Sequence, residues 1–273
     1  MLALQKKDII SLYFWLDDLV PKPEKKTSGR PSILSDSELI TILVWNTLAI
    51  KQKTLKDIYC WIKLDYRDEF PKLPTYAGFV QHAHRVLPLL ILILNCLLDD
   101  QAGLKFVDST MLEVCKLVRV ETHKVAKDLA KMGKNHQGWH YGFKLHLAIN
   151  HRRQLASLAL TPADVYDAQV LPKLLNEYTK IAVGDSHYGA SVMREYIFKT
   201  YGTVIIAPPH YKQRKKIMTP WQHKLLTMRP KIESVIDYLK EHLHLVSSFP
   251  RSVVGYLLHY VRILLGYQIM AIS

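Results

Sequence analysis

The chain has 273 residues, of which 49% are hydrophobic and 22% charged, and these proportions exclude a largely disordered or collagen-like protein. Its three cysteines form no C-x-x-C pair, which excludes a disulfide scaffold and a zinc ribbon, so we expect a reducing, cytoplasmic setting. The 37 Lys and Arg residues exceed the 24 Asp and Glu residues by 13. An excess of this size favours a polyanionic partner.

The first hundred residues are expected to form helices only. Apolar periodicity and helix-start signals predict helices at 4–20, 39–50, 54–61 and 75–98. Ser35 and Glu38 have the spacing of a capping box at the start of the second helix. A basic, proline-rich linker at 21–31 precedes it. Because consecutive short helices are typical of helix-turn-helix DNA contacts, we predict a DNA-binding module over 1–100.

From residue 101 onward, strands alternate with helices. Strands are predicted at 105–107, 141–149, 155–160, 181–183 and 204–207, and helices at 164–178, 190–200 and 229–244. The second and third strands are joined by the polar residues 150–154 and are expected to form a hairpin. This pattern predicts an α/β fold with a mixed sheet, in a second domain over 101–273.

Two apolar stretches are candidates for a membrane span. The stretch 87–98 is too short to cross a bilayer. The stretch 252–272 is longer but carries Arg262 near its middle, where insertion of an arginine costs about 2.5–3.5 kcal/mol. We therefore expect both to be core helices, in a protein that has no membrane partner.

Three acidic residues are candidate ligands for metal ions. Asp108 and Asp185 each follow an apolar strand, and Glu233 lies in the first turn of the last predicted long helix. Ligands gather at the carboxyl ends of strands in open α/β sheets. Carboxylates that converge there would hold two Mg²⁺ or Mn²⁺ ions, which suit phosphodiester displacement. On the residues alone the alternative stays open, because an Asp after a strand is also a common turn or cap residue.

Five segments of the second half occur in a distinctive order. They are Phe106–Thr110, Tyr141–His146, Leu160–Asp167, Gly184–Gly189 and Arg229–Val235. Together they resemble the catalytic domain of DDE-class bacterial insertion-sequence transposases. The resemblance implies an RNase H-like mixed sheet flanked by helices, with Asp108, Asp185 and Glu233 as the catalytic, metal-binding triad. It also implies terminal inverted repeats and target DNA as partners, and a homodimer in the synaptic complex.

The last of these segments resembles one branch of the family, whose signature is Y-x2-R-x3-E-x6-K. Arg229, Glu233 and Lys240 match its last three positions, whereas Leu226 stands in place of the tyrosine. The matching residues lie on one helix face, so Arg229 and Lys240 are expected to hold DNA phosphates on either side of Glu233. An Arg and a Glu four residues apart also form an ordinary helix salt bridge.

Further DNA contacts are expected from the basic residues. The range 202–232 contains seven Lys and Arg residues and no acid, and a run of one sign favours the phosphate backbone. Lys144 and His146 lie on the strand face opposite Phe143 and Leu145 and are expected to face DNA, the metals or water. The predicted contacts from these stretches and from the linker are Lys212, Arg214, Lys215, Lys216, Lys144, His146 and Arg30.

The leading hypothesis from the sequence is a metal-dependent, nucleoid-associated DNA transposase. One alternative is an RNase H-like nuclease or resolvase that cuts DNA without rejoining it. A second alternative is an inactive, DNA-binding relic of a transposase, and a third is a membrane-surface protein drawn by the same positive charge. His187 stands where the family usually has glycine, and its role stays open.

Overall fold

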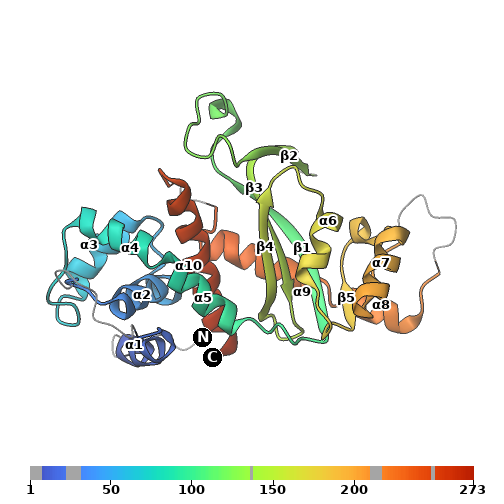
Figure 1. The fold of residues 1–273 in the computed structure, drawn as a ribbon, viewed down its shortest axis with the longest axis horizontal. Helices are drawn as coiled ribbons and strands as arrows, with labels where there is room; N and C mark the ends of the chain where they lie inside the picture. The colour runs from blue at the N-terminus through green and yellow to red at the C-terminus, as the bar shows by residue number, and fades with distance from the viewer. Residues whose placement is uncertain (1–7, 23–31, 136–137, 210–216, 247–249) are drawn as a thin grey trace. The chain divides into compact units, whose positions relative to one another are not determined.

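The structure is a computed structural model and describes residues 8–22, 32–135, 138–209, 217–246 and 250–273 (Figure 1). The chain divides into two compact units, described here one at a time. One consists of Met1–Leu97 with Glu241–Ala271, and the other of Leu98–Lys240. This division differs from the predicted domain 101–273, because the last helix of the chain packs with the N-terminal helices.

Within the described residues, six α-helices make up the first unit. They are α1 (Asp8–Leu19), α2 (Asp36–Trp45), α3 (Leu55–Asp65), α4 (Tyr76–Arg85), α5 (Leu87–Leu97) and α10 (Val253–Ile272). The predicted capping box is confirmed: the Ser35 hydroxyl accepts from the Glu38 N–H, and the Glu38 carboxylate accepts from the Ser35 N–H. The DNA-binding role of this unit stays a prediction.

The helix α10 forms the centre of the first unit. By length and composition it could cross a membrane, as could the bent pair α4 and α5 together, but 72% of the apolar window in α10 is buried inside the protein. A Cβ atom added at Gly266 would lie 2.5 Å from Cβ of Thr47, so only glycine permits this close helix contact. The Gln268 side chain donates to the Leu97 carbonyl at 2.6 Å. The helix is therefore a core helix, as its sequence predicts.

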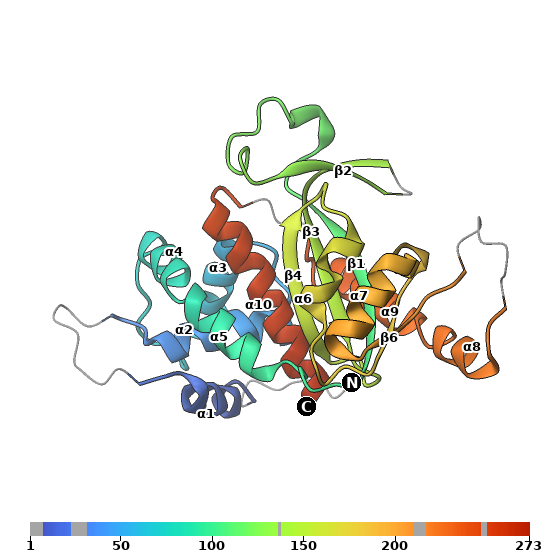
Figure 2. The same cartoon turned by 45° about the vertical axis from the view of Figure 1, so that its right-hand side comes forward.

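A six-stranded mixed sheet forms the second unit (Figure 2). Its strands are β1 (Leu104–Glu113), β2 (Lys131–Asn135), β3 (Gly138–Ile149), β4 (Leu155–Pro162), β5 (Ile181–Val183) and β6 (Val204–Ile206). Setting β2 aside, the order is β4-β3-β1-β5-β6, with β3 antiparallel to both its neighbours and β5 and β6 parallel to β1. This order and these directions are those of an RNase H-like sheet.

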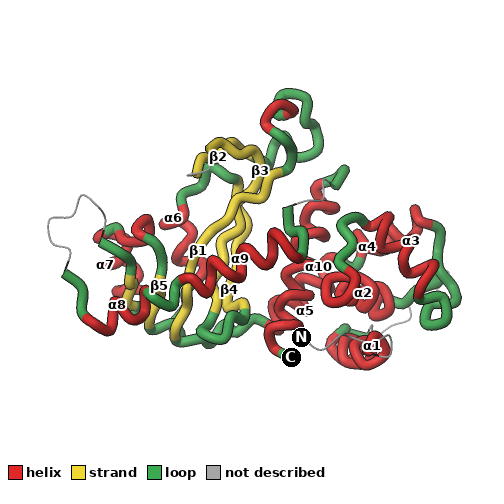
Figure 3. Tube along the Cα trace, turned by 180° about the vertical axis from the view of Figure 1, so that it is seen from behind, coloured by secondary structure: helices red, strands yellow, loops and turns green. Residues whose placement is uncertain are grey.

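Helices cover both faces of this sheet, namely α6 (Asp167–Leu174), α7 (Ser191–Tyr201) and α9 (Pro230–Asp237). A further short helix, α8 (Pro220–Leu226), has no buried residue. Val107 and Ala148 of the sheet pack with Leu171 of α6 and Ile197 of α7 in one buried cluster. Viewed from behind, α9 crosses the opposite face, where it contacts β1 (Figure 3). One face therefore carries the apolar core with α6 and α7, and the other carries α9.

Several observed elements differ from the predicted ones; for example, the helix predicted at 75–98 is divided into α4 and α5. The strand predicted at 105–107 extends to Glu113, because β3 supplies backbone partners along its whole length. The strand β2, which pairs with the first residues of β3, has no counterpart among the predicted strands. The predicted helix 229–244 is shorter, since α9 passes into the π-helical turn Tyr238–His242.

Candidate active site

Asp108 and Asp185 lie at the same level of two neighbouring strands. The strands β1 and β5 pair in parallel, and the last pair of residues is Phe106 with Val183. Asp108 comes two residues after Phe106, and Asp185 comes two residues after Val183. Adjacent strands are about 4.8 Å apart, so the pairing brings the two carboxylates into one region. Asp108 thus lies inside the long strand β1 and not at its end as predicted, yet it marks the point where the parallel pairing stops.

Glu233 joins this region through Arg229. The helix α9 begins with Pro230, and Arg229 is its N-cap residue. The Arg229 guanidinium places Nη1 2.8 Å from Oε1 of Glu233 and Nη2 3.4 Å from Oδ2 of Asp108. One cation therefore contacts two of the three predicted triad residues. Both the expected helix salt bridge and the expected proximity to the acidic cluster are present at Arg229.

The electrostatics of Asp108 show how closely the three carboxylates interact. The pKa of Asp108 is raised from 3.8 to about 6. Burial is the largest cause and the charges of Asp185 and Glu233 add to it, whereas the Ser109 N–H and Arg229 act in the opposite direction. The Ser109 N–H donates to Oδ1 at 2.8 Å. A carboxyl group whose pKa is perturbed by burial and by specific charges is typical of functional sites.

The residue types around Asp108 suit a divalent cation, but their arrangement is not a closed ligand set. Within the described ranges, no group of three or more His, Cys, Asp or Glu side chains is positioned to hold a metal ion. Arg229 contacts both Asp108 and Glu233. Three carboxylates supply the oxygen ligands that Mg²⁺ and Mn²⁺ prefer. The donor chemistry therefore fits the predicted ions.

His187 forms an ion pair with Asp185. Its Nδ1 lies 2.8 Å from Oδ2 of Asp185, while its backbone N–H donates to Oδ1 at 2.9 Å. The hydrogen bond with Asp185 and the charge of that residue raise the pKa of His187. The imidazole is 76% exposed. His187 thus holds one oxygen of Asp185 at the surface of the site, which the sequence did not indicate.

Lys144 and His146, which were expected to face DNA, the metals or water, are both buried beside Asp167. The Lys144 ammonium donates to the Val165 carbonyl at 2.7 Å and pairs with Asp167 at 3.1 Å. His146 is fully buried, with Nε2 2.9 Å from the Thr161 hydroxyl, and burial lowers its pKa to about 4. The alternation along β3 correctly places Lys144 and His146 on one strand face. That face is covered, however, because Asp167 at the start of α6 lies over the two side chains.

The other predicted DNA contacts fall into two groups. Lys212, Arg214, Lys215, Lys216 and Arg30 lie outside the described residues. Lys240 lies in the π-helical turn that follows α9 and is partly exposed. The family's tyrosine position, Leu226, is the last residue of α8. DNA binding at all of these positions stays a prediction.

Tyr188 and Asp167 belong to the site but were not singled out from the sequence. Tyr188 is fully buried, and burial and the charges of Asp167, Asp108 and Asp185 raise its pKa. Its hydroxyl has no hydrogen-bond partner among the described residues. A Cβ atom at Gly184 would lie 2.6 Å from the Tyr188 ring, so the glycine admits the ring beside Asp185. The signal was available, since Tyr188 lies in the segment Gly184–Gly189.

A comparison with protein families identifies the family of the chain. The family profile described as "Transposase DDE domain" matches residues 98–253, more than half of the chain. The chain therefore belongs to the DDE transposase domain family and is a transposase. The matched region contains Asp108, Asp185 and Glu233. No curated protein sequence matches the chain significantly.

Three solved structures of a transposase are among the structural matches. A pre-cleavage Mos1 transpososome is 14% identical with a TM-score of 0.24, covering 91% of this chain and 81% of that one. The Mos1 paired-end complex with the left transposon end is 12% identical, with a TM-score of 0.23 and coverages of 84% and 83%. The Mos1 mariner paired-end complex with Mn is 11% identical, with a TM-score of 0.23 and coverages of 95% and 85%. These scores are too low to support a shared fold, which rests here on the strand order.

Proposed function

We propose that this transposase cuts DNA at the ends of a bacterial insertion sequence and joins those ends to target DNA. The observation that carries the proposal is the alignment of Asp108 in β1 with Asp185 just after the neighbouring strand β5, with Glu233 linked to Asp108 through Arg229. This cluster lies within the region that matches the DDE domain family. The substrates are terminal inverted repeats and a target duplex, and a homodimer brings two ends together in the cytoplasm.

Asp108, Asp185 and Glu233 would hold the divalent cations, Mg²⁺ or Mn²⁺, in this reaction. Two such ions, when bound, supply the charge that activates a nucleophilic oxygen and stabilises the leaving oxygen of the phosphodiester. A bound cation would stabilise the charged form of Asp108 in particular, because this carboxylate is buried near the negative charges of Asp185 and Glu233. His187 orients one oxygen of Asp185 and leaves the other to the backbone N–H.

Arg229 supplies positive charge from the protein itself. Its guanidinium is 23% exposed and lies against two carboxylates. A guanidinium can form two parallel hydrogen bonds to a phosphate as readily as to a carboxylate. Arg229 is therefore the described side chain best suited to contact the scissile phosphate, and Lys240 follows it along the same stretch of chain.

The proposal is tested by end-cleavage assays on labelled terminal repeats in Mg²⁺. Asp108→Asn, Asp185→Asn and Glu233→Gln should each abolish strand cleavage while end binding, measured by gel shift, is retained. The matched control is Asp237→Asn, which removes an exposed carboxylate from the same helix as Glu233 and should cleave normally. Cleavage that survives in any of the three variants would refute that residue's role. Cleaved ends that never appear joined to a target plasmid would refute the joining step.

A further inference from the structure

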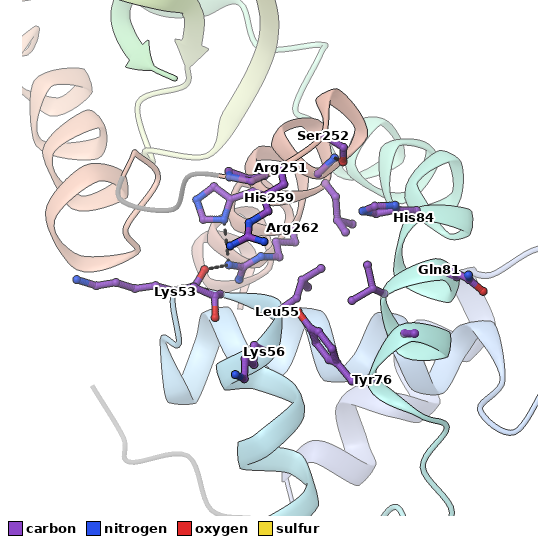
Figure 4. A pocket seen from close by; sticks show the side chains of 16 residues that line it. Lys53, Leu55, Lys56, Tyr76, Gln81, His84, Arg251, Ser252, His259 and Arg262 are labelled. Carbon is purple, nitrogen blue, oxygen red and sulfur yellow. Dashed lines mark hydrogen bonds between the residues drawn. The ribbon is translucent and has the colours of Figure 1, made fainter. Parts of the chain in front are cut away.

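The helical unit contains a cavity of about 880 Å³ (Figure 4). It is lined by residues of α3, α4 and α10 and by the residues just before α3 and α10. All sixteen residues that line it are described, and none of them is Asp or Glu. Six carry or can carry positive charge, namely Lys53, Lys56, His84, Arg251, His259 and Arg262. A cavity with cations on several sides and no acid is suited to an anion.

Arg262 is the central observation in this cavity. It is only 3% exposed, yet no carboxylate of the described residues lies within ion-pair distance of it. Its guanidinium donates to the Lys53 carbonyl and to Nδ1 of His259, both at 3.0 Å. Burial lowers the pKa of Arg262 to about 10, and no nearby negative charge opposes that effect. Buried charges in proteins are normally paired, so an uncompensated guanidinium at a cavity wall indicates an external counter-ion.

His259 fixes the direction of that guanidinium. An arginine can only donate, so Nδ1 of His259 accepts from it, and Nε2 therefore carries the hydrogen that faces the His244 carbonyl at 3.1 Å. Burial and the charge of Arg262 lower the pKa of His259 to about 3. The imidazole is thus neutral at physiological pH. It orients Arg262 and adds no opposing charge to the cavity.

The helix ends around the cavity add to its positive potential. Thr54 caps α3 and Ser252 caps α10, and both cap residues line the cavity, as does Tyr76 at the start of α4. Helix N-termini carry partial positive charge and bind phosphate groups. Three such ends therefore add positive potential to the cavity that Arg262 also lines.

We propose that this cavity binds a phosphate group, with Arg262 as its buried anchor and Lys56 and Arg251 as contacts at the rim. The side chains of Leu55, Tyr76 and Val80 line the remaining wall and provide an apolar surface for a sugar or base attached to that phosphate. The phosphate is that of a DNA strand or of a free nucleotide. This inference is independent of the chemistry at Asp108, since it concerns the other unit.

The test is the binding of inorganic phosphate to the full-length chain, measured by isothermal titration calorimetry. Lys56→Glu and Arg251→Glu reverse exposed charges at the rim and should each weaken phosphate binding about tenfold. Lys63→Glu makes the same change at the far end of α3, outside the cavity, and should leave the affinity unchanged. The proposal is overturned if the wild type shows no saturable binding, or if the rim variants bind phosphate as tightly as the control.

A second measurement addresses Arg262 itself. Phosphate should raise the melting temperature of the wild type, because a ligand that binds only the folded state stabilises it. Arg262→Gln should lose this rise. If that variant does not fold, the rim variants alone decide the question, since their side chains are exposed. An equal rise in the wild type and in all cavity variants would overturn the proposal.

The source of the phosphate follows from competition. If inorganic phosphate displaces a fluorescent DNA duplex and the rim variants weaken both ligands equally, the cavity holds a DNA phosphate. If the rim variants lose phosphate and a mononucleotide but bind DNA as the wild type does, it holds a free nucleotide. Cleavage by the acidic cluster is read separately with Asp108→Asn, so a failure of this proposal cannot be confused with a failure of the proposed function.

Discussion

Asp108→Asn should stabilise the metal-free protein while it abolishes activity. The pKa of Asp108 is raised to about 6 from 3.8, so the folded state holds this proton more tightly than the unfolded chain does. Below about pH 3.8 Asp108 is protonated in both states, so it costs no free energy of folding. The free-energy cost of holding it as a carboxylate grows between the two pKa values and is complete above about pH 6. An asparagine does not titrate and escapes this cost.

The magnitude follows from the shift and from the contacts that remain. A difference of about two pKa units corresponds to roughly 3 kcal/mol at neutral pH. The asparagine oxygen still accepts the 2.8 Å hydrogen bond from the Ser109 N–H. The attraction to Arg229, whose Nη2 lies 3.4 Å away, is already contained in the pKa of about 6, because it opposes the raising effects there. We therefore expect a net gain of about 2–3 kcal/mol near pH 7.5.

Urea unfolding followed by circular dichroism, in EDTA, measures this gain. Between about pH 7.5 and pH 4.5 the advantage of the variant should fall by roughly 2 kcal/mol, because most of the cost is removed when Asp108 becomes protonated. Asp237→Asn on α9 removes an exposed carboxylate and should change stability little at either pH. The reasoning fails if Asp108→Asn is destabilising near pH 7.5, or if its advantage does not depend on pH.

The remaining predictions concern cations and packing. Mg²⁺ or Mn²⁺ should raise the melting temperature of the wild type but not of Asp108→Asn, and equal rises would place the ions elsewhere. Gly184→Ala forces a Cβ atom within 2.6 Å of the Tyr188 ring and should lower the free energy of unfolding by about 1–3 kcal/mol, measured with urea; an unchanged value would mean that the ring can move away. Lys105 is buried, and burial lowers its pKa. Its ammonium donates a 3.3 Å hydrogen bond to the Leu174 carbonyl, which also accepts a hydrogen bond from the Ser157 hydroxyl. Lys105→Met should therefore gain about 1 kcal/mol in the same assay, whereas a loss would show that nearby acids stabilise the ammonium.

Much of the fold follows from local sequence signals. The hairpin of β3 and β4, the short apolar strands β5 and β6, and the capping box at Ser35 agree with the patterns that predicted them. Each depends on periodicity or on side chains a few residues apart, which is information that the sequence carries directly. The family resemblance is carried by the same kind of information, because its five segments could be read in order along the chain.

Other features required knowledge of distant partners. Lys144 and His146 occupy polar positions on a strand and were expected to face DNA, the metals or water, and the structure buries them against Asp167 and Thr161 from another part of the chain. The end of β1 was placed too early because the acidic and hydroxyl residues after Val107 are typical of a turn. Only the pairing with β3 supplies backbone partners for that stretch.

The sequence by itself determined the helical and mixed-sheet halves, the three acidic positions and the excess of positive charge, because composition, periodicity and ordered motifs are local properties. The tertiary structure decided where these groups meet. It aligned Asp108 with Asp185 across two strands, set Arg229 between Asp108 and Glu233, and buried Arg262 in a cavity without a carboxylate. Burial and the distance between charges decide the pKa of a carboxylate or the need for a counter-ion. Both quantities arise only when segments far apart in the chain pack together.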